Sequence, residues 1–207
     1  MPTLSTLLLF ALFSFILAIT PGPDMLLLVS RSATQGRRAG MAALVGTQVG
    51  CVIYAMAAGF GLSELFNAVP AAFETVRWAG AAYLLYIAWR TITGRDETAS
   101  GSTAVLAAPS LPVLFRQGLF TNLLNPKVAL FMLALWPQFM APGTTAVLEQ
   151  AVVMAVIFVS IGAAVNVVVV VVADRAGQWL LRRLSQRSAR IALASVFAGL
   201  AARLAWN

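Results

Sequence analysis

Long apolar stretches separated by short polar connections make up most of the chain. Each stretch approaches the roughly 20 apolar residues that an α-helix needs to cross a bilayer. There are six of them: Leu4–Val29, Gly40–Leu62, Ala71–Trp89, Leu114–Trp136, Ala151–Ala173 and Ile191–Trp206. The fifth contains six consecutive valines, Val167 to Val172, which we expect to be helical because a lone strand cannot satisfy its backbone in lipid. The pattern therefore predicts an all-α protein with six transmembrane helices.

Composition supports a membrane protein. The chain is 60% hydrophobic and only 10% charged, whereas a soluble domain carries roughly 25% charged residues. The net charge of +7 is therefore interpreted as a topology signal, and no nucleic-acid partner is expected. The absence of histidine and the single cysteine, Cys51, argue against a disulfide framework or a thiolate metal cluster within one chain, and we expect no cofactor. The first apolar run lacks a basic leader and is longer than a signal peptide core, so it is predicted to be a mature helix.

The arginines predict the orientation of the helices. They gather in the first, third and fifth connections: Arg31, Arg37 and Arg38; Arg90, Arg95 and Arg116; and Arg175, Arg182, Arg183, Arg187 and Arg190. Basic connections face the cytoplasm, so both termini are expected on the outer side. Tryptophans at the predicted helix ends, Trp89, Trp136 and Trp206, are interpreted as an aromatic belt.

Two of the apolar runs are interrupted by proline. The first contains Thr20-Pro21-Gly22-Pro23-Asp24 and the fourth contains Asn125-Pro126-Lys127. Proline breaks a helix, and a break at membrane depth is tolerated only against protein or a water-filled cavity. Thr20 and Asn125 are good N-caps and proline suits the first helical position, so each motif is predicted to end one half-helix and begin another. We expect the two breaks to meet and to form the site of a transporter.

The breaks carry opposite charges. The start of a half-helix suits a carboxylate, and Gly22 allows a ligand or backbone to approach closely. Asp24 is the only acid expected at depth and could receive an ammonium group or carry a proton; alternatively, it only stabilises the helix dipole. Lys127, the only lysine, could bind a carboxylate or simply pair with Asp24. Two ordinary proline kinks are the alternative explanation of the whole pattern.

Other polar and small residues lie inside the apolar runs. The amides of Gln48, Asn122 and Asn166 either line the site or hold helices together. Gly46 and Gly50, like the small residues of the last run, allow close helix packing, either within the chain or in a homodimer.

The connection over residues 93–112 is rich in Ser, Thr, Ala and Gly and is interpreted as a flexible linker. It divides one polytopic domain, residues 1–207, into half-repeats 1–92 and 113–207. Because each half holds three helices, the second enters the membrane from the opposite side, which predicts two inverted three-helix repeats with helices 1 and 4 broken. Residues 174–190 alternate apolar residues with arginines, which favours a short helix on anionic headgroups or, equally, a solvated basic loop.

Several motifs together resemble the LysE/RhtB family of amino-acid exporters, over nearly the whole chain. They are Thr20-Pro21-Gly22-Pro23-Asp24; Ser30-Arg31-x4-Gly36-Arg37-Arg38-x-Gly40; Gly46-x3-Gly50; Gly80-x2-Tyr83-Leu84-x-Tyr86-x2-Trp89; Phe115-Arg116-x-Gly118-x3-Asn122-x2-Asn125-Pro126-Lys127; and Pro137-Gln138-Phe139. The resemblance implies a bacterial inner-membrane protein that exports amino acids or close derivatives by proton antiport, and with the arginine pattern this puts both termini in the periplasm. Many relatives carry an ionisable residue in the second helix where this chain has Gln48 and Tyr54, so a neutral, homoserine- or threonine-like substrate is expected.

Four kinds of function can be compared with these features. A secondary-active exporter, with an amino acid, protons and membrane lipid as its partners, accounts for both breaks. A passive channel for small polar metabolites is the alternative, because two half-helices that meet can also form a pore. An enzyme is disfavoured because the chain offers no nucleophile–base pair or metal cluster. A purely structural helix bundle would leave the cost of burying Asp24 and Lys127 unexplained.

Overall fold

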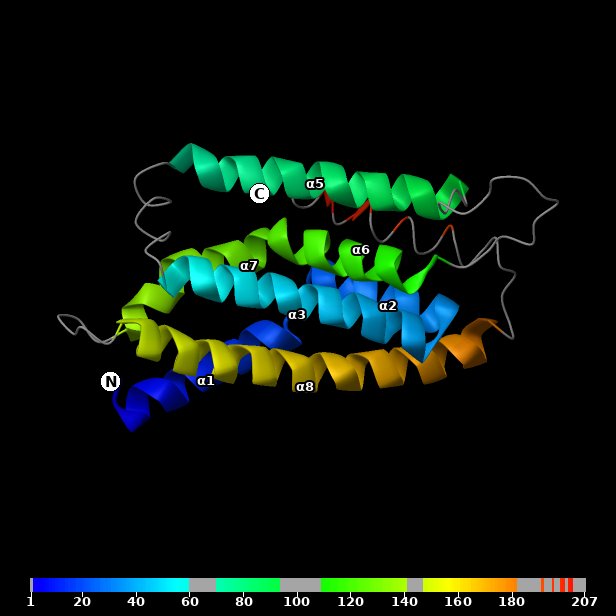
Figure 1. The fold of residues 1–207 in the computed structure, drawn as a ribbon. Coiled ribbons are helices and arrows are strands. Elements are labelled where there is room, and N and C mark those ends of the chain that lie inside the picture. The colour runs from blue at the N-terminus through cyan, green and yellow to red at the C-terminus, as the bar shows by residue number, and fades with distance from the viewer. Residues whose placement is uncertain are drawn as a thin grey trace.

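The computed structural model describes residues 2–59, 70–93, 109–140 and 147–181, together with residues 191, 195, 198–199 and 201–202. Within these ranges every regular element is a helix (Figure 1), as predicted. The α-helices are α1 (Leu4–Ile19), α2 (Pro23–Gln35), α3 (Arg37–Gly59), α5 (Pro70–Thr93), α6 (Leu111–Leu123), α7 (Pro126–Leu130) and α8 (Val147–Leu181). A π-helix, η1 (Phe131–Leu135), and a 3₁₀-helix, η2 (Trp136–Phe139), continue α7.

The first apolar run is a broken span, as predicted. Helices α1 and α2 meet at an angle of 52°. The prediction that Thr20 caps the second half-helix is wrong: Thr20 closes α1, its hydroxyl donating to the Ile16 carbonyl over 2.6 Å. Gly22 is the N-cap and Pro23 the first helical residue of α2. The physical reason is that a residue before proline avoids the helical region; Gly22 is therefore extended, with φ −157° and ψ −178°, and Pro21 cannot start a helix.

The second break follows the prediction closely. Helix α6 ends at Leu123, and the Asn125 side chain caps α7 by accepting a hydrogen bond from the Lys127 backbone N–H over 3.0 Å. Pro126 occupies the first helical position, where its missing N–H costs nothing. The helical path then continues through η1 and η2, so the predicted fourth helix is a series of short helical segments.

Helix α3 packs mainly against α6 and also contacts α2 and α8. The α3–α6 contact is close because glycines face it from both sides. A Cβ atom at Gly46 would meet the Phe115 carbonyl oxygen, and one at Gly118 would meet the Ala43 carbonyl oxygen. Small residues therefore serve packing within the chain, which was one of the two roles expected for Gly46.

Helix α8 contains the valine run, which confirms that Val167–Val172 is helical. The helix continues without a break to Leu181. The described part of residues 174–190, residues 174–181, is therefore helical and continues α8, so a solvated loop is wrong there, whereas a helix on the headgroups stays a prediction. Residues 182–190 lie outside the described part of the chain.

Membrane-length apolar helices are present. Arg37–Ala58 and Leu148–Gly177 are each long and apolar enough to cross a bilayer, and the bent pair α1 and α2 counts as a third span. Large apolar side chains such as Leu8, Leu12, Val156 and Val168 are exposed on α1 and α8, where lipid would cover them. The sixth run, Ile191–Trp206, and the linker 93–112 fall mostly outside the described residues, so six spans and an inverted repeat stay predictions.

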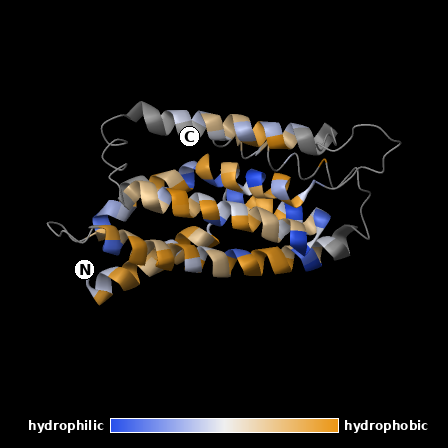
Figure 2. Ribbon diagram, in the orientation of Figure 1, coloured by the Kyte–Doolittle hydropathy of each residue, from blue (hydrophilic) through white to orange (hydrophobic). Residues whose placement is uncertain are grey.

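Helix ends that carry arginines gather at one end of the bundle. The α2–α3 connection, the start of α6 and the end of α8 lie together (Figure 1), and hydrophilic residues are frequent there (Figure 2). A Cβ atom at Gly177 of α8 would meet the Ala33 backbone of α2, so these two ends are in contact. The described helix ends that border the first, third and fifth connections therefore share a side of the bundle, while the side of the membrane that they face stays a prediction.

The buried core consists of two clusters. One contains Phe10, Met132, Trp136, Met154 and Phe158, and the other contains residues such as Leu27, Ala43, Leu84 and Val170. Assignment of Trp136 to an aromatic belt is wrong, because its side chain is fully buried and meets the Phe10 ring edge-on with centroids 5.2 Å apart. Trp89 is 63% exposed, as a belt requires, and Trp206 lies outside the described residues.

Candidate functional site

The two breaks meet inside the bundle, as predicted. Lys127, at the start of α7, donates from Nζ to the carbonyl oxygens of Leu17 (3.1 Å) and Thr20 (2.8 Å) at the end of α1. Asn122, near the end of α6, donates from Nδ2 to Oδ2 of Asp24 in the first turn of α2 over 2.8 Å. The second pair of half-helices, α6 and α7, therefore reaches the first pair through two polar side chains.

Lys127 replaces a backbone hydrogen bond that proline removes. In a continuous helix the Leu17 carbonyl would accept from the N–H of residue 21, but that residue is Pro21, which has none. The Lys127 ammonium takes its place, and a cation at the end of a helix also suits the dipole of α1. Gly22 packs against this side chain, since a Cβ atom there would lie 3.2 Å from Cε and Nζ of Lys127.

Asp24 and Asn122 leave hydrogen-bonding capacity unused. Oδ1 of Asp24 and Oδ1 of Asn122 are both buried and have no hydrogen-bond partner in the structure. Asp24 and Lys127 form no salt bridge within 4.0 Å; their polar partners come from α6 and α1 respectively. The two charged groups are therefore not joined as a contact ion pair in this structure.

Helix α3 supports the second break. The Tyr54 hydroxyl donates to the Leu123 carbonyl over 2.6 Å, the carbonyl that would accept from Lys127 in a continuous helix. Cys51, one turn earlier, accepts from Nδ2 of Asn122 over 3.4 Å. Gly50 makes room for this approach, because a Cβ atom there would lie 2.5 Å from Oδ1 of Asn122.

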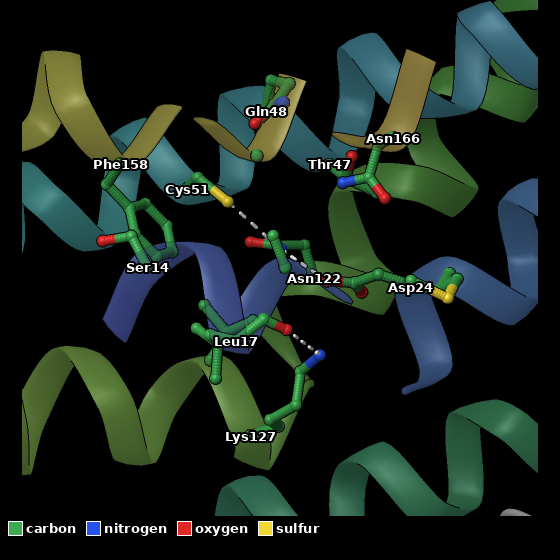
Figure 3. Close-up of a pocket in the computed structure, with 14 residues that line it drawn as sticks. Ser14, Leu17, Asp24, Thr47, Gln48, Cys51, Asn122, Lys127, Phe158 and Asn166 are labelled. Carbon is green, nitrogen blue, oxygen red and sulfur yellow. Dashed lines mark hydrogen bonds between the residues drawn. The ribbon is translucent and has the colours of Figure 1, made fainter. Parts of the chain in front are cut away.

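A cavity of about 40 Å³ lies between these groups, enough to hold water. Five predicted site residues line it: Asp24, Gln48, Asn122, Lys127 and Asn166 (Figure 3). The other six, Thr20, Pro21, Gly22, Pro23, Asn125 and Pro126, do not line the cavity but build the breaks that border it. Sequence reasoning allowed Lys127 to pair with Asp24, but it predicted neither the bonds of Lys127 to carbonyls of α1 nor the bond from Asn122 to Asp24.

Further lining residues were missed as site residues. They are Ser14, Leu17, Ala18, Met25, Thr47, Cys51, Val128, Phe158 and Gly162. A signal existed for two of them: Thr47 and Cys51 share one face of α3 at i, i+4 spacing, beside Gln48. The hydroxyl of Ser14 is satisfied by the Phe10 carbonyl over 2.7 Å, so nothing in the sequence separates it from an ordinary helix serine.

Comparison with known proteins decides the family. The model of the LysE type translocator family matches residues 15–207. The chain belongs to the LysE type translocator family. This translocator is 31% identical, over 95% of its length and 94% of the relative's, to a homoserine/homoserine lactone efflux protein of Salmonella typhimurium. It is 30% identical, over 90% and 88% of the two lengths, to an uncharacterized membrane protein of Pseudomonas aeruginosa. No solved structure matches it.

The cavity of this translocator suits a ligand with two opposite charges. A buried carboxylate oxygen without a partner, on Asp24, could accept from an ammonium group. The Lys127 ammonium has three donors, of which the carbonyls of Leu17 and Thr20 use two, and the third can meet a carboxylate. Groups of three or more metal-ligating side chains are absent from the described residues.

Proposed function

We propose that this translocator exports a small neutral amino acid, of the homoserine or threonine kind, across the bacterial inner membrane in exchange for protons. The observation that carries the proposal is the meeting of an unfilled acceptor on Asp24 and a partly used ammonium on Lys127 at one cavity between two helix breaks. Half-helices that meet inside a bundle are a recurring way to build a transport site.

Asp24 is the group that couples substrate to protons. In the exchange, the protonated carboxyl of Asp24 releases its proton to the cytoplasm, and the substrate ammonium takes the vacated place. After the site opens to the other side, the amino acid leaves and a proton from outside binds Asp24. Asn122 holds the carboxylate through Oδ2, so that Oδ1 stays directed to the exchanging group.

A neutral substrate follows from the charges around the cavity. Asp24 is the only acid among the lining residues and Lys127 the only base. Once the substrate ammonium and carboxylate have taken these two groups, no counter-charge remains for an ionised side chain. The similarity to a relative named for homoserine and homoserine lactone efflux supports the same class.

This exchange moves one positive charge inward for each zwitterion that leaves. A membrane potential, negative inside, should therefore drive export in proteoliposomes even without a pH gradient, since one charge crossing 100 mV gains roughly 2.3 kcal/mol. A passive channel for the zwitterion would give a flux that the potential does not change. Reconstituted protein, labelled homoserine and a potassium diffusion potential separate the two.

Asp24→Asn tests the coupling role. The variant keeps the size and the hydrogen bond to Asn122 but cannot carry a proton, so we expect concentrative transport under a pH gradient to be abolished while the protein stays folded. Glu149→Gln, on an exposed residue near the start of α8, is the matched control and should transport normally. Near wild-type concentrative export by purified Asp24→Asn would refute the coupling role.

The orientation is part of the proposal. With the arginine-bearing ends of the bundle at the cytoplasm, both termini lie in the periplasm and the linker 93–112 joins two inverted half-repeats inside the cell. Reporter fusions test this directly. A fusion within residues 93–112 should be active only for a cytoplasmic reporter, and activity of a periplasmic reporter there would reverse the orientation.

A further inference from the structure

The wall of the cavity that α3 and α8 form carries two amides, Gln48 and Asn166. Figure 3 shows both on the far side of Asn122 from Lys127. Lys127 therefore lies on one side of Asn122 and the two amides on the other, with Asp24 beside Asn122, to which it is hydrogen-bonded. The amides lie where the side chain of a bound amino acid would extend.

Neither amide makes a short hydrogen bond that holds two helices together. Gln48 donates from Nε2 to the Val159 carbonyl at 3.5 Å, the outer limit for a hydrogen bond, and its carbonyl oxygen bonds to no other residue. The Asn166 amide makes no side-chain hydrogen bond in the described structure, although it lines the cavity. An amide that glues two membrane helices together would be bonded across the contact. Unused amides at this depth instead require water or a ligand.

Gly162 leaves open space beside Gln48. It lies one turn before Asn166 on the same face of α8, and a Cβ atom there would stand 3.7 Å from both Nε2 and Oε1 of Gln48. That is ordinary contact and not a clash, so helix packing does not demand glycine. The consequence of glycine at this position is room in the cavity.

We propose that Gln48, Gly162 and Asn166 form the side-chain subsite of this translocator, which accepts a short uncharged side chain bearing a hydroxyl or carbonyl group. The inference rests on the proposed function and adds the residues that set specificity. Amides can donate and accept at once, which matches a hydroxyl or carbonyl. They offer no counter-charge to lysine or arginine.

Counterflow in proteoliposomes tests the subsite with matched substrates. Homoserine and norvaline have side chains of the same length and differ in a terminal hydroxyl or methyl, and alanine reports binding of the charged ends alone. We expect the wild type to prefer homoserine over norvaline by roughly tenfold, since a site built for a hydroxyl rejects its apolar analogue. In Asn166→Leu and Gln48→Met the ratio should fall to about one, with alanine counterflow kept within about twofold.

Gly162→Ala is the second, independent variant, and it should leave the helix intact because alanine is the better helix former. It should favour alanine over homoserine by about threefold or more relative to the wild type. Gly199→Ala is its control, because a Cβ atom at Gly199 would meet nothing within 4 Å; it should leave every ratio unchanged.

The outcomes separate the two proposals. If the wild type exchanges amino acids but the variants keep its homoserine-to-norvaline ratio, or lose all substrates equally, the subsite is overturned and the proposed function stands. If the wild type exchanges no amino acid in any arm, the proposed function falls and the subsite with it.

Discussion

Each of the two helix breaks leaves a backbone carbonyl without its helical hydrogen bond, and the two breaks satisfy that carbonyl in different ways. Between α1 and α2 the chain uses two prolines and an extended glycine, with no side-chain cap at the start of α2. Between α6 and α7 it uses one proline, and Asn125 caps the new helix locally. At both breaks, a carbonyl left without its helical partner is satisfied from elsewhere: Leu17 by Lys127 and Leu123 by Tyr54.

The two breaks differ in which part of the molecule supplies the hydrogen-bond donor. The first break depends on Lys127, a residue of the second break that also borders the cavity. The second break depends on Tyr54, on the intact helix α3. The first break is therefore tied to the state of the transport site, whereas the second is fixed by the scaffold. A ligand that drew the Lys127 ammonium away would loosen α1 and leave α6 in place.

Lys127→Met should have the largest effect, because it removes both hydrogen bonds to α1 and the charge at the cavity. Leaving a buried carbonyl unpaired costs about 1–3 kcal/mol. The Leu17 bond is part-buried and the Thr20 bond is exposed, so we expect about 1–3 kcal/mol of lost stability together with loss of transport. Unfolding of the purified protein in detergent by denaturant measures the first, and counterflow the second.

Lys127→Arg is the comparison variant for Lys127→Met. It keeps a cation that can reach the same carbonyls, so stability should largely return, whereas transport should recover only in part because the planar guanidinium presents its donors differently. If Lys127→Met unfolds at the wild-type denaturant concentration, the first break does not depend on the second.

The same substitution should give unequal results at two glycines, Gly50 of α3, which contacts Asn122 beside the second break, and Gly22 in the first break. Gly50→Ala places a Cβ atom 2.5 Å from Oδ1 and 2.9 Å from Cβ of Asn122, so Asn122 must leave Asp24, and transport should fall by roughly tenfold or more. Gly22→Ala meets only the flexible end of Lys127 at 3.2 Å, and its extended backbone suits alanine, so transport should stay within about threefold.

The measurement for this pair is counterflow normalised to folded protein. Alanine inside a helix normally gains about 1 kcal/mol over glycine, so a loss at Gly50 would mean that the contact with Asn122 outweighs that gain. Equal effects at Gly50 and Gly22 would contradict the view that one break is rigid and the other adjustable.

The sequence was sufficient to locate the breaks and to predict that they meet, but not to predict the contacts that join them. Proline positions identify where the helices end, because a missing N–H acts locally, and Asn125 was correctly assigned as a cap for that reason. The local rule failed at Thr20, where Pro23 forces Gly22 to be extended and moves the helix start by two residues. The contacts of Lys127 with Leu17 and of Tyr54 with Leu123 span 110 and 69 residues, and no local pattern predicts such pairs.

Local patterns were also insufficient in two apolar segments, at Trp136 and at residues 174–181. A tryptophan at the end of an apolar run is placed equally well at a membrane interface or in a core, and only packing against Phe10 decides between them. The arginines after Ala173 indicated a basic segment, but whether it continues the helix depends on tertiary contacts such as that of Gly177 with Ala33.

Tyr54→Phe should have the smallest effect and tests the independence of the second break. It removes one hydroxyl while keeping the ring, and leaves the Leu123 carbonyl without its donor, which costs about 1 kcal/mol. Because Asn125 still caps α7, the break itself should persist, and transport should fall only slightly.

Combining Tyr54→Phe with Lys127→Met then decides how far the breaks are separate. Sites without a shared partner add within about 0.5 kcal/mol, so the double variant should lose the sum of the two single losses if α3 alone fixes the second break. A coupling well above that value would mean that Lys127 and Tyr54 stabilise one unit. The first break would then be no more adjustable than the second, because displacing Lys127 from α1 would also strain the bond that holds α6.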